Sequence, residues 1–129
     1  MTRSKVLIVD DSRFIVHRLT VMLEEISTIQ HIFTAGTYAE GNKLINEVQP
    51  QIVLLDINLP DNTGVELLRT VRKKNKAVKI IMITNQVNDH YRRICGLLGA
   101  NYFVDKSNEF EIIPDIISQI QSSDLLQVQ

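Results

Sequence analysis

Cysteine is nearly absent from this sequence of 129 residues, and so are long hydrophobic runs and an excess of charge of either sign. The one cysteine, Cys95, leaves no disulfide to be formed within the chain. No apolar run approaches the ~20 residues that a membrane-spanning helix needs. The 14 Lys and Arg nearly balance the 15 Asp and Glu, and the net charge of −1 gives no global reason to expect nucleic acid or an anionic membrane as a partner.

Several motif classes are missing as well. The three histidines, His17, His31 and His90, lack the spacing to cysteines or acids that is typical of a zinc site. No Gly-x-Gly-x-x-Gly pattern marks a nucleotide-binding loop, and the first residues lack the length and cleavage pattern of a signal peptide. Together with a single cysteine, which we expect to be buried in a helix, these absences predict a protein of the reducing cytoplasm.

Short apolar runs alternate with segments of helical period along the chain, which indicates βαβ units and a parallel sheet. Strands are predicted at about Lys5–Val9, Gln30–Ala35, Ile52–Leu55, Lys79–Ile83 and Tyr102–Val104. Helices are predicted at about Ser12–Glu25, Thr37–Val48, Val65–Lys74, Asp89–Leu98 and Ile113–Gln121. This alternation predicts a flavodoxin-like, doubly wound α/β fold with a five-stranded parallel sheet in the order 2-1-3-4-5 and five helices. The length suits one domain spanning residues 1–129, with a core at about residues 4–121 and a frayed tail at 122–129.

Local signals set the ends of the predicted helices. Thr37 and Glu40 form a capping-box pattern, in which each side chain bonds the backbone N–H of the other residue. Gly99 is placed to follow the fourth helix as its C′ residue. Because proline inside a helix costs about 3 kcal/mol, we expect a turn at residues 107–111 and Pro114 in the first turn of the last helix.

Polar side chains follow four of the predicted strands at the points where the strands end. Asp10 and Asp11 come after the first strand, Asp56 after the third, Thr84 after the fourth and Lys106 close after the fifth. In an open parallel sheet, ligands bind outside the carboxyl ends of the strands. Alone, each residue is explained as readily by a turn, a helix cap or a solvated loop charge. Their coincidence at one edge of the sheet predicts a functional site.

Three neighbouring carboxylates repel one another unless a cation is present. Oxygen ligands of this kind favour Mg²⁺ over Zn²⁺. Asp56, alone at the end of a central strand, is placed as a carboxylate nucleophile that forms an acyl phosphate. The Lys106 ammonium and the Thr84 hydroxyl are then available to bind phosphoryl oxygens, because phosphoryl transfer needs mostly positioning and neutralisation of charge.

At these residues the chain resembles the receiver domain of two-component response regulators. The matching segments are VLIVDDS (6–12), DINLPDNTGVELL (56–68), IT (83–84) and GANYFVDKS (99–107). The order, the spacing and the strand context of these segments all match the family pattern. The resemblance covers roughly residues 4–121, which is nearly the whole chain.

The resemblance implies a role for each site residue. Asp56 matches the phosphoacceptor. Asp11, Asp56 and the backbone carbonyl of Asn58 would bind Mg²⁺, while Asp10 would act on the metal through water or by orienting Lys106. Lys106 matches the invariant lysine of the family. The implied phosphodonor is a phosphohistidine on a sensor histidine kinase or a histidine phosphotransfer protein.

The resemblance also implies an output. Thr84 matches the switch hydroxyl and Phe103 the switch aromatic, which rotates inward when the hydroxyl moves toward the phosphate. The face formed by the fourth helix, the fifth strand and the fifth helix would then change its affinity for a downstream protein, and the same face can mediate homodimerisation on phosphorylation. Asn58 and Gln86 would position or block the water that hydrolyses the acyl phosphate, and as weakly basic amides they predict an intermediate lifetime.

Three residues depart from the usual family pattern. Asn85 follows Thr84 where a small residue is usual, so it can crowd the phosphate or slow a bulky donor. Ser107 follows Lys106 where proline is common, which makes a cis peptide bond less expected there. Phe103 lacks the hydroxyl of a tyrosine. Phe14, just after the acid pair, has two readings: it is buried, or it is exposed where a histidine-bearing helix of the donor docks.

These residues predict a single-domain response regulator that catalyses its own phosphorylation and dephosphorylation rather than a turnover enzyme. No DNA-binding domain fits after Gln121, so no direct nucleic-acid contact and no membrane contact are expected. One alternative is a pseudo-receiver that acts only as a protein-binding module, although all the expected acids and the lysine are present. A Mg²⁺-dependent aspartyl-phosphate phosphohydrolase is the other, and it is disfavoured because Asn58 stands where a second acid is expected.

Overall fold

The computed structural model describes residues 3–85 and 88–128, with side chains described as far as residue 123. Five parallel strands form one sheet in the order β2-β1-β3-β4-β5. The strands are β1 (Ser4–Val9), β2 (Ile29–Ala35), β3 (Ile52–Asp56), β4 (Lys79–Thr84) and β5 (Tyr102–Asp105). The helices are α1 (Arg13–Glu24), α2 (Tyr38–Val48), α3 (Gly64–Lys74), α4 (Asp89–Leu97) and α5 (Ile113–Val128), with the short 3₁₀ helix η1 (Phe110–Ile112) before α5. The predicted flavodoxin-like fold and strand order are therefore confirmed.

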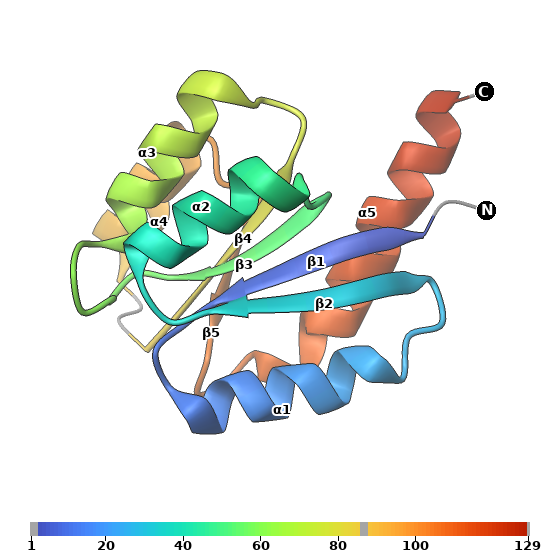
Figure 1. Cartoon of the computed structure of the whole chain (residues 1–129), viewed down its shortest axis with the longest axis horizontal. Coiled ribbons are helices and arrows are strands. Elements are labelled where there is room, and N and C mark those ends of the chain that lie inside the picture. The colour runs from blue at the N-terminus through green and yellow to red at the C-terminus, as the bar shows by residue number, and fades with distance from the viewer. Residues whose placement is uncertain (1–2, 86–87, 129) are drawn as a thin grey trace.

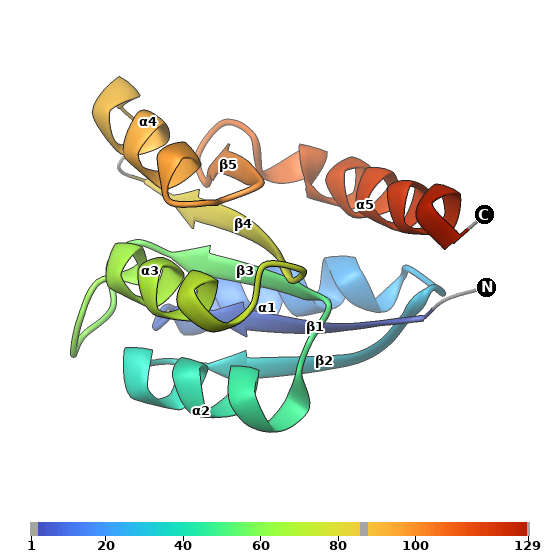
Figure 2. The ribbon, with the colours of Figure 1, turned by 90° about the horizontal axis from the view of Figure 1, so that it is seen from above.

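Helices cover both faces of the sheet (Figures 1 and 2). Val6 and Ile8 of β1 point into a core shared with α1 and α5. Leu7 and Val9, the alternate residues, point into a second core shared with α2, α3 and α4. A strand that is covered on both faces needs apolar side chains at every position. This requirement explains the unbroken apolar runs in the sequence.

The parallel register brings the carboxyl ends of the strands together at one edge of the sheet. Val9 of β1 lies opposite Leu55 of β3, and Asp56 lies opposite Ile83 of β4. Thr84 in turn lies opposite Asp105 of β5. The polar residues that end these strands therefore meet at the same edge.

Side-chain caps begin the helices close to the predicted positions. The hydroxyl of Ser12 accepts a hydrogen bond from the N–H of Ile15 at the start of α1. The hydroxyl of Thr37 accepts one from the N–H of Glu40 at 3.0 Å, which confirms one half of the capping box. The return bond from Glu40 is not among the contacts of the described chain, so that half of the prediction was wrong. At the fourth helix, Gly99 adopts a φ of 107°, as expected for a C′ glycine.

The C-terminal segment differs from the prediction. Instead of a frayed tail after Gln121, α5 continues to Val128. Pro114 lies in its first turn as expected, and neither glycine nor proline follows to interrupt the helix. The expected turn before it contains the short helix η1. Within the described residues, no helix is long and apolar enough to cross a membrane.

Candidate functional site

Three carboxylates meet at the carboxyl edge of the sheet. Asp10 follows β1 and is 2% exposed, Asp56 ends β3 and is 5% exposed, and Asp11 is exposed beside them. One oxygen from each carboxylate lies within 4.8 Å of the others. Oxygen ligands at this spacing suit a hard divalent cation. The structure thus brings together the three acids that the sequence singled out.

Lys106 is buried between two of these acids. Its Nζ lies 2.5 Å from Oδ2 of Asp10 and 3.2 Å from Oδ2 of Asp56. The backbone N–H of Lys106 bonds the carbonyl of Thr84 at 3.0 Å, which fixes the lysine against the end of β4. Oδ1 of Asp10 accepts a bond from the N–H of Ser12 at 2.8 Å. Oδ2 of Asp10 is buried, and the Lys106 ammonium is its partner.

The pKa of Asp56 is raised from 3.8 to about 6, and burial is the largest cause. The negative charge of Asp10 also contributes to the rise, while the Lys106 ammonium opposes it through its charge and a hydrogen bond. The raised pKa means that this site destabilises the ionised form of the carboxyl group. A bound cation would favour the ionised form, which is the form that acts as a nucleophile.

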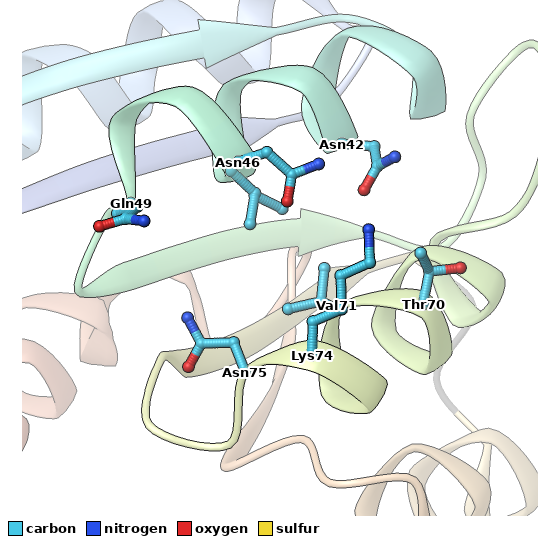
Figure 3. A pocket seen from close by; sticks show the side chains of 8 residues that line it. Asn42, Asn46, Gln49, Thr70, Val71, Lys74 and Asn75 are labelled. Carbon is cyan, nitrogen blue, oxygen red and sulfur yellow. The ribbon is translucent and has the colours of Figure 1, made fainter.

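An open hollow of about 320 Å³ lies over this cluster and is lined by Asp10, Asp11, Ser12, Asp56, Asn58, Leu59, Pro60, Asn85 and Lys106. A smaller hollow of about 140 Å³ lies between α2 and α3. Figure 3 shows its polar walls, where the amides of Asn42 and Asn46 face Lys74 across the groove. Its lining residues include no carboxylate. The hollow at the carboxyl edge, which is lined by the three acids and Lys106, can therefore combine a cation with a phosphoryl group.

The two residues predicted to act as a switch lie on β4 and β5. Thr84 is fully buried at the end of β4. Phe103, on β5, is half-buried, and the guanidinium of Arg92 from α4 lies 4.8 Å from the centre of its ring. Arg92 also forms an ion pair with Glu109 at 3.9 Å. The aromatic ring is thus held by a cation from the neighbouring helix, an interaction worth about 0.5–1 kcal/mol at an exposed position.

The remaining predicted residues have varied positions. Asn58 lines the hollow, whereas Gln86 lies outside the described residues. Asn85 also lines the hollow, and its side-chain carbonyl accepts a hydrogen bond from the hydroxyl of Ser107 at 3.3 Å. Two of the three departures from the family pattern therefore contact each other. Phe14 is 67% exposed, so the interpretation that buries it was wrong.

The sequence interpretation missed the roles of two residues after β3, one in the loop and one at the start of α3. Gly64 lies so close to β3 that a Cβ there would be 1.9 Å from the carbonyl oxygen of Asp56. Asp61 accepts hydrogen bonds from the first two N–H groups of α2. The contact of Asp61 joins two segments that only the folded sheet brings together, so no local pattern reveals it. The contact of Gly64 depends on how the loop closes onto the end of β3.

The response regulator receiver domain model matches residues 6–118 of this chain. The chain belongs to the response regulator receiver family. The membership explains why the acids, the hydroxyl and the lysine all lie at one edge of the sheet. Receiver domains are signalling modules of two-component systems.

Relatives of this receiver domain have different overall architectures. It is 35% identical over 109 residues to a protein-glutamate methylesterase/protein-glutamine glutaminase of Koribacter versatilis, a match that covers 84% of this chain and 30% of the relative. It is 28% identical to the response regulator GacA of Pseudomonas aeruginosa, with 90% of this chain and 54% of the relative covered. The chain thus spans between about a third and a half of these curated relatives.

A solved structure supports the same assignment. The CheY-like receiver domain protein of Methanospirillum hungatei is 27% identical and superimposes with a TM-score of 0.84. The match covers 95% of this chain and 98% of that one. The receiver domain of Thermotoga maritima CheB, at 22% identity, has the same fold with a TM-score of 0.82, covering 95% of this chain and 96% of that one.

Proposed function

We propose that this receiver domain accepts a phosphoryl group from a phosphohistidine donor onto Asp56. The observation that carries the proposal is the arrangement around that carboxylate. Asp56 lies beside Asp10 and Asp11, with oxygens within 4.8 Å, and the Lys106 ammonium is 3.2 Å away. The open hollow above the cluster gives a donor access to it.

Mg²⁺ is the cofactor that these residues fit. The donors are hard oxygens, and one oxygen from each of the three carboxylates lies within 4.8 Å of the others. Asp11, Asp56 and the carbonyl of Asn58 would hold the ion, with Asp10 acting through water or by orienting Lys106. The bound ion supplies neutralisation of the charge on the carboxylates and on the phosphoryl group.

The residues of the chain then have defined tasks. An oxygen of Asp56 attacks the phosphorus, the bond from phosphorus to the histidine nitrogen breaks, and that nitrogen keeps the electron pair and takes up a proton. Lys106 pairs with one phosphoryl oxygen of the acyl phosphate, and the hydroxyl of Thr84 donates a hydrogen bond to another. Only the ionised carboxylate is nucleophilic, and a bound cation would favour that form by opposing the burial that raises the pKa of Asp56.

The donor is a sensor histidine kinase or a histidine phosphotransfer protein that docks on α1. Phe14 is exposed there, and Arg13 and Arg18 add positive charge to the same helix. In this docking mode Phe14→Ala lowers the labelling rate from any phosphohistidine protein that labels the wild type, and it leaves labelling by acetyl phosphate unchanged. An equal loss of labelling rate with the phosphohistidine protein and with acetyl phosphate would contradict the role of Phe14 in docking.

The output is a change on the face formed by α4, β5 and α5, triggered by Thr84 and Phe103. This face binds a downstream protein or relays the phosphate, and it can form a homodimer on phosphorylation. Light scattering after size exclusion, with and without fluoroberyllate, measures the dimer directly. An unchanged mass would leave protein binding as the output of this face.

Asn58 and Gln86 set the lifetime of the acyl phosphate by orienting the hydrolytic water. Substituting either residue should change the dephosphorylation rate, and no change in either variant would remove that role. The module acts as a regulator, not as a turnover enzyme, although some relatives carry a methylesterase name. We place it in the cytoplasm, where kinases have access to ATP, and we treat residues 1–129 as one domain.

The deciding experiment measures intact mass after incubation with Mg²⁺ and acetyl phosphate, for wild type and Asp56→Ala. A phosphoryl adduct that requires Mg²⁺ and is lost in Asp56→Ala is the expected result. No adduct, together with no binding of fluoroberyllate, would overturn the proposal and favour a pseudo-receiver that only binds proteins. Continuous release of phosphate from small phosphate esters would favour a phosphohydrolase.

A further inference from the structure

Asp61, at the tip of the loop between β3 and α3, contacts a different helix. Its Oδ1 accepts a hydrogen bond from the N–H of Tyr38 at 2.8 Å, and its Oδ2 accepts one from the N–H of Ala39 at 3.1 Å. Tyr38 and Ala39 are the first two residues of α2. One carboxylate therefore caps a helix that lies more than 20 residues earlier in the chain.

Local groups satisfy the next two N–H groups of α2. The hydroxyl of Thr37 accepts from Glu40, and its carbonyl accepts from Gly41 at 2.9 Å. Asp61 completes the set and places a negative charge at the positive end of the helix dipole. These hydrogen bonds lower the pKa of Asp61, the bond from Tyr38 most of all, so the carboxylate stays ionised at neutral pH.

The same loop forms one wall of the phosphorylation site. Asn58, Leu59 and Pro60 line the hollow above Asp56, and Asp61 is the next residue. At its base the loop is closed by a bridge between Asn58 and Thr63 and by a 2.6 Å hydrogen bond from the N–H of Gly64 to the carbonyl of Ile57. The contact of Asp61 with α2 is a further attachment, at the tip of the loop.

We propose that Asp61 is a positioning residue for the phosphorylation site. By attaching the tip of the loop to α2, it fixes Asn58, whose carbonyl would hold Mg²⁺, and the adjoining wall of the hollow. A ligand backbone that is held in place before the metal arrives loses less conformational freedom on binding. The inference rests on the proposed function, and it adds that α2 takes part in Mg²⁺ binding without contributing a ligand.

The test compares Asp61→Ala, Asp61→Asn and the control Glu47→Ala. Asparagine keeps one carbonyl oxygen that can accept a bond from α2, but it loses the charge. Glu47, exposed in the last turn of the same helix, loses the same charge without affecting the loop. Mg²⁺ affinity is measured by calorimetry, and hydrogen exchange of the Tyr38 and Ala39 amides reports the contact itself. Urea unfolding establishes that each variant is folded under these conditions.

We expect Asp61→Ala to speed exchange at both amides and to weaken Mg²⁺ binding about fivefold, since supporting contacts typically change metal affinity by about tenfold or more when they touch a ligand directly. Asp61→Asn should fall between Asp61→Ala and wild type, and Glu47→Ala should match wild type. Faster exchange in Asp61→Ala with wild-type Mg²⁺ affinity would reduce Asp61 to a helix cap and overturn the inference alone. Failure of the wild type to bind Mg²⁺ would instead overturn the proposed function.

Discussion

Strand β3 has an apolar part, residues 52–55, and a charged residue at its end, Asp56. Both parts are buried, but they affect stability in opposite directions. Ile52, Val53, Leu54 and Leu55 are all fully buried, and each is apolar. The next residue, Asp56, is 5% exposed and carries a carboxyl group. Burying each large aliphatic side chain stabilises the fold by about 1.5–3 kcal/mol. Burying the carboxylate destabilises its charged form and raises its pKa to about 6.

The comparison shows that a fold of this kind can position a reactive group at the end of a buried strand. The strand interior is stabilised by contacts on both sides, so it holds the carboxylate in a fixed position at the strand end. Lys106 offsets part of the free-energy cost of burying carboxylates through its ion pairs with Asp10 and Asp56. A reactive group is thus held rigidly by a neighbouring segment that has no role in the reaction. Four substitutions test this division.

Leu54→Ala should have the largest effect. Leu54 is fully buried in the core shared with α1 and α5, and its truncation should lower the free energy of unfolding by about 4 kcal/mol. Urea denaturation measures this change. The matched control is Leu97→Ala, because Leu97 is 80% exposed and its truncation should cost under about 0.5 kcal/mol. Similar losses in both variants would contradict the assignment of the core.

Lys106→Met should cost about 3 kcal/mol at about pH 8, because it leaves Asp10 and Asp56 buried without their cation. The loss should shrink as the pH falls and Asp56, whose pKa is raised by burial, takes up a proton. Lys76→Met, at an exposed lysine, should be close to neutral. A loss that does not vary with pH would show that the lysine stabilises by packing rather than by charge.

Gly64→Ala should cost about 2–3 kcal/mol, because the added Cβ would overlap the carbonyl oxygen of Asp56. The backbone shift that relieves this overlap should also slow labelling by acetyl phosphate. Gly36→Ala provides the comparison, since no atom lies within 4 Å of the Cβ that it adds. Thermal unfolding and intact mass together measure both effects. Equal stability and equal labelling of the two variants would show that the close approach of Gly64 to Asp56 does not constrain residue 64.

Asp56→Asn should have the smallest effect on stability and the opposite sign. The pKa of Asp56 is raised from 3.8 to about 6 in the folded chain, so the folded state binds a proton more tightly than the unfolded state. The penalty is therefore absent below about pH 4, grows as the pH rises to about 6, and stays constant above it. A shift of this size corresponds to about 3 kcal/mol. Because solvent in the open hollow screens the charge, we expect Asp56→Asn to gain about 2 kcal/mol above that range in metal-free protein.

Urea unfolding of the wild type and Asp56→Asn across this pH range checks the prediction. The difference between the two proteins is the relevant quantity, because other carboxylates titrate in both. A gain that is already complete at about pH 4 would contradict the proposed origin of the effect in the buried charge.

Much of the fold was predictable because its signals are local. Unbroken apolar runs marked the strands that are covered on both faces, and helix caps such as Ser12 and Thr37 marked where helices begin. The end of α5 was not predictable in this way. After Ile120, its last described core residue, the helix continues to Val128. The helix continues past this residue because neither glycine nor proline follows to interrupt it.

The features of the site also fall into those that local sequence signals predict and those that they do not. The sequence by itself determined which groups are present and, through the rule that parallel strands end at one edge, that Asp10, Asp56 and Lys106 lie together. Only the tertiary structure decided how they pair and that Phe14 is exposed. It also decided that Asp61 caps α2. The ion pairs of Lys106 and the hydrogen bonds of Asp61 join segments far apart in sequence. Their geometry, like the exposure of Phe14, depends on how the sheet and its helices pack together.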